Sequence, residues 1–193
     1  MKQLFFLTLF LSTLISNSQI RYNKTVKLMG SRFDISVVAN SEEQGYYYID
    51  LAIDEIDRIE KLVSSWDPNS QTSEINNNAG NKPVVVDKEL FDLIERSLAI
   101  SKLTDGAFDI SYASLDKVWK FDGSMNTMPS KDEIVNSVSK VGFENIILNR
   151  NDTTVYLKLK GMKIGFGAIA KGYAADKAKK LLQDKGVTAG IIN

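Results

Sequence analysis

The stretch GFGAIAKGYAAD, from Gly165 to Asp176, is the most informative part of the sequence. Gly165, Gly167 and Gly172 lie around the start of a helix that we expect over residues 168–185. Glycine lets the backbone come close to a ligand, while the first amides of a helix lack helical partners and carry a partial positive charge. The stretch therefore favours a ligand that carries phosphate.

Two more stretches accompany it. In TDGAFD, from Thr104 to Asp109, the Asp-Gly pair is typical of a tight turn, but a turn alone does not explain the Ala-Phe-Asp that follows. In MGSRFDI, from Met29 to Ile35, a methionine and a glycine precede an alternating apolar strand. The pattern argues against a Rossmann dinucleotide site, because Gly165 and Gly167 do not open a full GxGxxG within a βαβ unit.

Together the three stretches resemble the signature of the FAD:protein FMN transferase (ApbE-type) family, which usually has Met-Gly-Thr where this chain has Met-Gly-Ser. The resemblance covers residues from about Thr25 to Asn193. It implies an enzyme that moves FMN from FAD onto a Thr or Ser hydroxyl of a target protein and releases AMP. FAD is then the substrate, Mg²⁺ the cofactor on the phosphate oxygens, and a subunit of a membrane electron-transport complex the acceptor.

The resemblance also implies which residues form the site, although it assigns no catalytic residue. The expected FAD-binding residues are Met29, Trp66, Ala107, Phe108, Asp109, Gly165 and Lys171. The expected metal ligand is Ala168, through its backbone carbonyl. Many family members have an aspartate where this chain has Gly165, so any side-chain contact made there is lost.

Each assignment has a physical reason and an alternative. The thioether of Met29 suits a flavin ring, but methionine is also an ordinary core residue. Trp66 can stack on an aromatic ring of the cofactor or plug the core. Lys171 can neutralise phosphate charge or be a solvated helix lysine, and Asp109 can accept hydrogen bonds from the cofactor. We expect Ser73–Asn76 to shape the wall of the site and Gly172 to pack the helix.

The composition removes several classes of chemistry. The chain has no histidine and no cysteine, which excludes Ser-His and Cys-His nucleophiles, zinc fingers, iron–sulfur clusters and disulfides. Any metal must be held by oxygen ligands, which favours hard ions such as Mg²⁺. Lysine plus arginine and aspartate plus glutamate both number 24, so nothing points to nucleic acid or an anionic membrane as partner.

The first 18 residues have the features of a secretory signal peptide: Lys2, an apolar core from Leu4 to Ile15, and small residues at 16–18. The core is too short for a permanent membrane span. We therefore expect an exported protein, periplasmic or associated with the cell envelope, and not a lipoprotein because cysteine is lacking.

Periodicity predicts an α+β fold with mixed or antiparallel sheets and packed helices. The expected strands are a pair within 25–39 and single strands at 84–86, 145–148, 153–159 and 188–193. Helices are expected over residues 41–65 and 168–185, the second stopped by Gly186. Another is capped by Asp87, and a fourth begins at a Ser130/Glu133 capping box and ends near Gly142. Residues 66–81 are expected to form a loop. The resemblance makes this an ApbE-like, T-fold-like domain.

The sequence ends within an apolar run, Gly190 to Asn193. We expect residues 19–193 to be the N-terminal two-thirds of the transferase domain, with the remaining Mg²⁺ ligands further on and weak or no activity in the chain alone. Two other functions stay open. One is an FAD pyrophosphatase that yields FMN and AMP, and the other is a flavin-binding protein without turnover.

Overall fold

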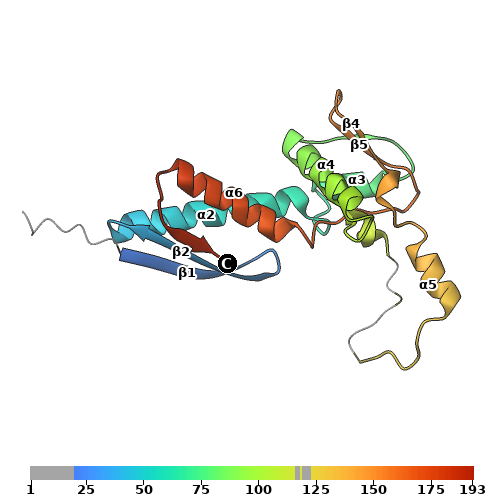
Figure 1. Ribbon diagram of the computed structural model, residues 1–193, viewed down its shortest axis with the longest axis horizontal. Coiled ribbons are helices and arrows are strands. Elements are labelled where there is room, and N and C mark those ends of the chain that lie inside the picture. Colours follow the sequence, from blue (N-terminus) through green and yellow to red (C-terminus); the bar gives the residue numbers. More distant parts are fainter. Residues whose placement is uncertain (1–19, 116–117, 119–122) are drawn as a thin grey trace, which may run out of the picture. The chain divides into compact units, whose positions relative to one another are not determined.

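The computed structural model describes residues 20–115, 118 and 123–193, so the expected signal peptide lies outside the described residues. The described part is α+β, as predicted, and its two three-stranded sheets are antiparallel throughout (Figure 1). The chain divides into two compact units, Met1–Asp57 with Gly172–Asn193, and Arg58–Lys171. Among the described helices, none is long and apolar enough to cross a bilayer.

The sheet of the first unit has the order β1-β2-β6. Strands β1 (Ile20–Leu28) and β2 (Ser31–Ala39) form the predicted hairpin, and β6 (Gly190–Ile192) pairs with the other side of β2. The turn residues Met29 and Gly30 have φ of 50° and 70°. Two successive residues with positive φ match the twist of a two-residue hairpin turn. This conformation is less favourable for Met29 than it would be for glycine.

The core of the first unit includes every second residue of β2 from Phe33 onward. Its buried residues are Phe33, Ile35, Val37 and Ala39. Helices α2 (Glu42–Val63) and α6 (Ala170–Asp184) both lie along one side of this sheet in Figure 1. They bury residues at helical spacing, namely Ile49, Ala52 and Ile56 in α2 and Ala174, Ala178 and Leu182 in α6. The predicted stop of α6 is confirmed, since Gly186 has φ 87° and the next amide returns to the carbonyl of Leu182.

The sheet of the second unit has the order β3-β5-β4. Its strands are β3 (Val84–Val85), β4 (Ile146–Asn149) and β5 (Thr154–Leu157), close to their predicted positions. Ile146, Val155 and Leu157 are buried. The sheet thus presents one face to a core, as its alternation predicts.

Helix α4 (Lys88–Leu103) supplies much of that core. Its buried residues are Leu90, Phe91, Leu93, Ile94, Ser97 and Ser101. Asp87 lies at the N-cap position, as predicted, but its side chain does not cap the helix. Instead its carboxylate accepts a hydrogen bond from the side-chain amide of Gln71 at 2.7 Å. The expected side-chain cap is therefore wrong, because a partner distant in sequence competes for the carboxylate.

The predicted loop at 66–81 is partly wrong, because it contains helix α3 (Gln71–Asn77). The side chain of Ser70 caps this helix by accepting from the amide of Ser73 at 3.0 Å. Thr72, Ser73 and Ile75 are buried. The buried face consists largely of small hydroxyl residues, so hydrophobic periodicity gives no signal here.

Helix α5 (Lys131–Val138) begins at the predicted capping box and ends earlier than expected. The amide of Glu133 donates to the Ser130 hydroxyl at 3.3 Å, and the Glu133 carboxylate accepts from the Ser130 amide at 2.7 Å. These hydrogen bonds, the backbone one foremost, hold the pKa of Glu133 below its ordinary value. Two short 3₁₀ helices, η1 (Ile110–Ser114) and η2 (Phe143–Asn145), complete the unit.

Candidate functional site

The segment that leads into α6 is held by side chains rather than by neighbouring strands. The hydroxyl of Ser114 accepts from the amide of Lys163 at 2.8 Å and donates to its carbonyl at 2.9 Å. The side-chain amide of Asn76 bonds Ile164 in the same double manner, at 2.8 Å to N–H and 3.1 Å to C=O. The Gly165 amide donates to the carbonyl of Ile110 at 2.9 Å. We call residues 163–167 the approach segment; its backbone is fixed before the helix begins.

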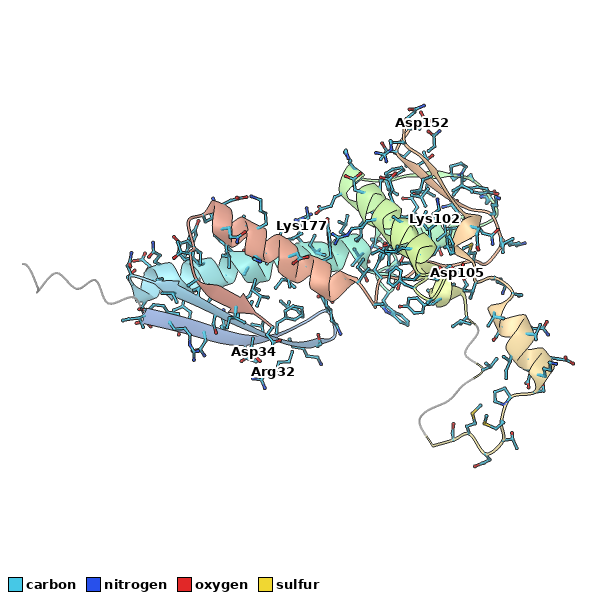
Figure 2. The ribbon with its side chains drawn as sticks, in the orientation of Figure 1. Arg32, Asp34, Lys102, Asp105, Asp152 and Lys177 are labelled. Carbon is cyan, nitrogen blue, oxygen red and sulfur yellow. The ribbon has the colours of Figure 1, made fainter. Side chains whose placement is uncertain are left out.

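The TDGAFD stretch forms a turn that leads into η1. Asp105 and Gly106 have φ of 50° and 78°, so the tight turn is real. Figure 2 shows Asp105 at the end of α4, close to Lys102. The amide of Gly106 donates to the carbonyl of Ser101 at 2.8 Å, and the amide of Phe108 donates to the hydroxyl of Thr104 at 3.1 Å. Ala107 is exposed and Phe108 is half-buried.

Asp109 has structural partners for both oxygens of its carboxylate. Oδ1 accepts from the amide of Ser111 at 2.7 Å, which caps η1, and Oδ2 accepts from the amide of Phe143 at 2.9 Å. The hydroxyl of Ser111 accepts from the amide of Gly142 at 2.8 Å. The end of TDGAFD therefore fastens the 142–143 turn, and any bond from Asp109 to a ligand must use its remaining lone pairs.

Gly165 and Gly167 face the side chain of Tyr112 on η1. A Cβ on Gly165 would lie 3.1 Å from the Ala113 Cβ and 3.4 Å from the Tyr112 hydroxyl oxygen. A Cβ on Gly167 would lie 2.7 Å from that oxygen. Neither glycine has a positive φ, so packing rather than backbone conformation explains both. A side chain at position 165 would require Ala113 to give way by a few tenths of an ångström.

The start of α6 is open at the surface. The amides of Ile169 and Ala170 both donate to the carbonyl of Phe166, at 3.0 and 2.8 Å. Gly167, Ala168 and Lys171 are exposed. Within the described residues the Lys171 ammonium has no ion-pair or hydrogen-bond partner. The region can offer amide donors and one cation to an anion.

Trp66 and Met29 lie apart in sequence from these segments and have different surroundings. The side chain of Trp66 is 85 % exposed after the end of α2, so the alternative of a plug over the core is wrong. An exposed aromatic ring there is available for stacking. Met29 is half-buried in the β1–β2 turn of the first unit. The structure joins the GFGAIAK segment to Ile110, the residue that follows TDGAFD, by the bond from Gly165, and both segments belong to the second unit.

The oxygen ligands available for Mg²⁺ are few. No group of three or more Asp or Glu side chains converges within the described residues. Ala168 can offer a carbonyl oxygen at an exposed position, but Mg²⁺ requires octahedral coordination. The residues described here do not by themselves make a magnesium site. The two carboxyl groups whose pKa is lowered, Asp34 and Glu133, belong to other parts of the fold.

The sequence matches the profile of the ApbE family over residues 29–193. The chain belongs to the ApbE family. A protein of Klebsiella pneumoniae (strain 342) named FAD:protein FMN transferase is 30 % identical over 172 residues, which are 89 % of this chain and 53 % of that protein. A protein of the same name from Buchnera aphidicola subsp. Baizongia pistaciae is 30 % identical over 188 residues, covering 93 % of this chain and 54 % of its own.

Solved structures agree on the fold. The ApbE protein of Thermotoga maritima superposes with a TM-score of 0.77 at 29 % identity, over 90 % of this chain and 57 % of that one. The flavin transferase ApbE of Vibrio cholerae gives a TM-score of 0.76 at 19 % identity, over 91 % and 57 %. The predicted family and fold are confirmed. The chain spans about half the length of the relatives that it matches.

Sequence reasoning missed four residues that build the site. Asn76 appeared only as part of a wall, and Ser111, Tyr112 and Ser114 were not singled out. Asn76 and Ser114 hold Ile164 and Lys163, just before Gly165. Ser111 bonds Asp109, and Tyr112 faces Gly165 and Gly167. Their only sequence signal was position, since three of them directly follow TDGAFD. Gly172 was expected to pack the helix, but a Cβ there would meet nothing within 4 Å, so that expectation is wrong.

Proposed function

We propose that the protein carrying this chain transfers FMN from FAD to a Thr or Ser hydroxyl of a target protein. The acceptor oxygen attacks the phosphorus of the FMN half, the bond to the bridging oxygen of the diphosphate breaks, and AMP leaves. The acceptor loses its proton and gains a phosphoester-linked FMN. The relatives' shared name supports the reaction, and the junction of TDGAFD with the glycine-flanked start of α6 supports the place.

The proposed contacts follow from the chemistry of each segment. The amides of the exposed residues Gly167 and Ala168 favour the diphosphate, as does the ammonium of Lys171, which has no partner among the described residues. We propose that the exposed ring of Trp66 stacks on an aromatic ring of FAD and that the thioether of Met29 packs against the flavin. We propose further roles for Ala107, Phe108, Asp109 and Gly165 as the wall beside the cofactor.

We also propose that the reaction depends on Mg²⁺. The ion would take the carbonyl oxygen of Ala168 as one ligand, and Mg²⁺ commonly takes others from water and substrate phosphates. When bound, it would neutralise charge on the diphosphate. One protein ligand among the described residues is too few to hold it. We therefore expect the 193-residue chain alone to bind FAD weakly and to transfer little or no FMN.

Cellular context is part of the proposal. The apolar segment within residues 1–18 supports export to the periplasm or cell envelope. A membrane electron-transport subunit with a flavinylation Thr or Ser would then be the acceptor. Detection of the mature N-terminus after fractionation tests the location.

The reaction is tested by incubating the protein with FAD, Mg²⁺ and an acceptor peptide carrying a Thr. Expected products are covalent flavin on the acceptor and an equal amount of AMP. FMN and AMP formed equally well without acceptor would instead establish a pyrophosphatase. Tight FAD binding that is indifferent to Mg²⁺, with no AMP, would establish a binding protein.

The role of Lys171 is tested by Lys171→Ala. Loss of a charge-assisted contact to phosphate should weaken FAD binding about tenfold or more. Lys179→Ala is the matched control, because Lys179 is an exposed lysine on the same helix. Equal binding by both variants would contradict the proposed contact.

A further inference from the structure

Tyr112 lies on η1, which follows TDGAFD and contacts the approach segment. Tyr112 is 42 % exposed, and its phenol has no hydrogen-bond partner within the described residues. Its oxygen occupies the space that a Cβ of residue 167 would need, at 2.7 Å, and lies 3.4 Å from the corresponding position at Gly165. The hydroxyl is thus next to the backbone that opens α6.

This placement bears on Gly167 more than on Gly165, where the nearest atom is the Cβ of Ala113. Neither has a φ that only glycine adopts easily, so alanine would fit their backbone conformation. At residue 167 only the phenol oxygen is too close: the next atom of the ring, Cζ, lies 3.9 Å from the Cβ position, an ordinary contact distance. A side chain at residue 167 would therefore force the Tyr112 hydroxyl to move.

We propose that Tyr112 is a ligand-contacting residue of the site, its hydroxyl donating a hydrogen bond to a phosphate oxygen of the bound flavin dinucleotide. The proposal rests on the proposed function. Gly167 and Ala168 are exposed, and a phosphate that accepted from their amides would lie near the phenol, whose O–H has no competing protein acceptor among the described residues. Gly167 is part of the same arrangement, because the absence of a side chain there leaves room for the Tyr112 hydroxyl.

The test is a double-mutant cycle of Tyr112→Phe and Gly167→Ala, with FAD affinity measured by titration of flavin fluorescence. Tyr112→Phe keeps the ring over the glycines and removes only the hydroxyl. Loss of a hydrogen bond to a charged group should weaken FAD binding about tenfold. Gly167→Ala should weaken it by a similar factor, because the new methyl displaces the phenol. In the Tyr112→Phe background Gly167→Ala should cause almost no further loss.

Tyr47→Phe is the control, since Tyr47 is an exposed tyrosine of the first unit. Wild-type affinity in Tyr112→Phe would overturn the proposal, and so would losses that simply add in the double variant. The same four proteins are also compared by thermal unfolding. Gly167→Ala should lower the melting temperature less in the Tyr112→Phe background than in the wild type. If the whole protein that carries this chain binds no FAD but this stability coupling is present, the proposed function fails, and the ligand contact with it, while the packing of Tyr112 on Gly167 stands.

Discussion

The side-chain amide of Asn76 pairs with both backbone groups of Ile164, accepting from its N–H at 2.8 Å and donating to its C=O at 3.1 Å. Asn76 lies on α3, far from Ile164 in sequence, and Ile164 is fully buried. The amide therefore does for the approach segment what a neighbouring strand does in a sheet.

Replacing Asn76 by alanine should destabilise the protein markedly. It leaves two backbone groups of a buried residue without their partner, and each such group costs about 1–3 kcal/mol. Asn76→Asp should destabilise the protein at least as much as Asn76→Ala, because it places a carboxylate oxygen against the carbonyl oxygen of Ile164. The free energy of unfolding in urea measures the effect. Asn77→Ala is the control, since Asn77 is exposed on the same helix and should change stability by less than about 0.5 kcal/mol.

Asp109→Asn should lower stability by about 1–3 kcal/mol, whether or not FAD is present. One of its two acceptor oxygens becomes a donor, which then faces the amide of Ser111 or of Phe143. Asp105→Asn, in the same stretch, should be nearly neutral, because Asp105 is exposed and asparagine tolerates its φ of 50°. Unchanged thermal unfolding in Asp109→Asn, with FAD affinity lost, would assign Asp109 to the cofactor alone.

The two motifs illustrate what sequence can and cannot provide. Helix α6, its glycine stop and the β1–β2 hairpin follow from local periodicity and turn chemistry, and they were predicted close to their observed bounds. The junction of Ile110 with Gly165 depends on a backbone hydrogen bond between segments distant in sequence. Only the family resemblance placed the two motifs in one site, because no periodicity encodes such a bond.

The errors have a common cause in side chains that serve distant partners. Asp87 was expected to cap α4 and instead accepts from Gln71. Helix α3 was hidden because its buried positions are threonine, serine and a single isoleucine. Polar residues that satisfy backbone groups elsewhere in the fold look, in sequence, like the residues of an exposed loop.

The stability of α5 should depend on acid pH through Glu133. Hydrogen bonds from the Ser130 amide and hydroxyl hold its pKa below the ordinary value. A group with a lowered folded pKa stabilises the native state fully above its unfolded pKa, and the contribution is lost as pH falls through the folded pKa. The protection factors of the α5 amides, which are exchange rates corrected for the intrinsic pH dependence, should therefore fall below that point.

Glu133→Gln should remove this acid dependence, since glutamine can keep the capping box without titrating. Asp132→Asn, at the adjacent exposed position, should leave it in place. A Glu133 carboxyl that titrates at its ordinary pKa, followed by its carbon chemical shift, would contradict the proposed cap contribution.

Gly172→Ala should stabilise the protein by about 0.5–1 kcal/mol, because glycine in a helix costs roughly that much relative to alanine. Gly172 lies in the first turn of α6, and a Cβ there would meet nothing within 4 Å. Thermal unfolding of the chain without ligand measures the gain, and Ala175→Gly on the same helix should cause a loss of similar size. If Gly172→Ala raises stability but lowers FAD affinity, the phosphate approaches the Gly172 backbone itself. If both quantities rise or stay unchanged, the ligand stays on the Gly167 side of the helix start, where Tyr112 lies.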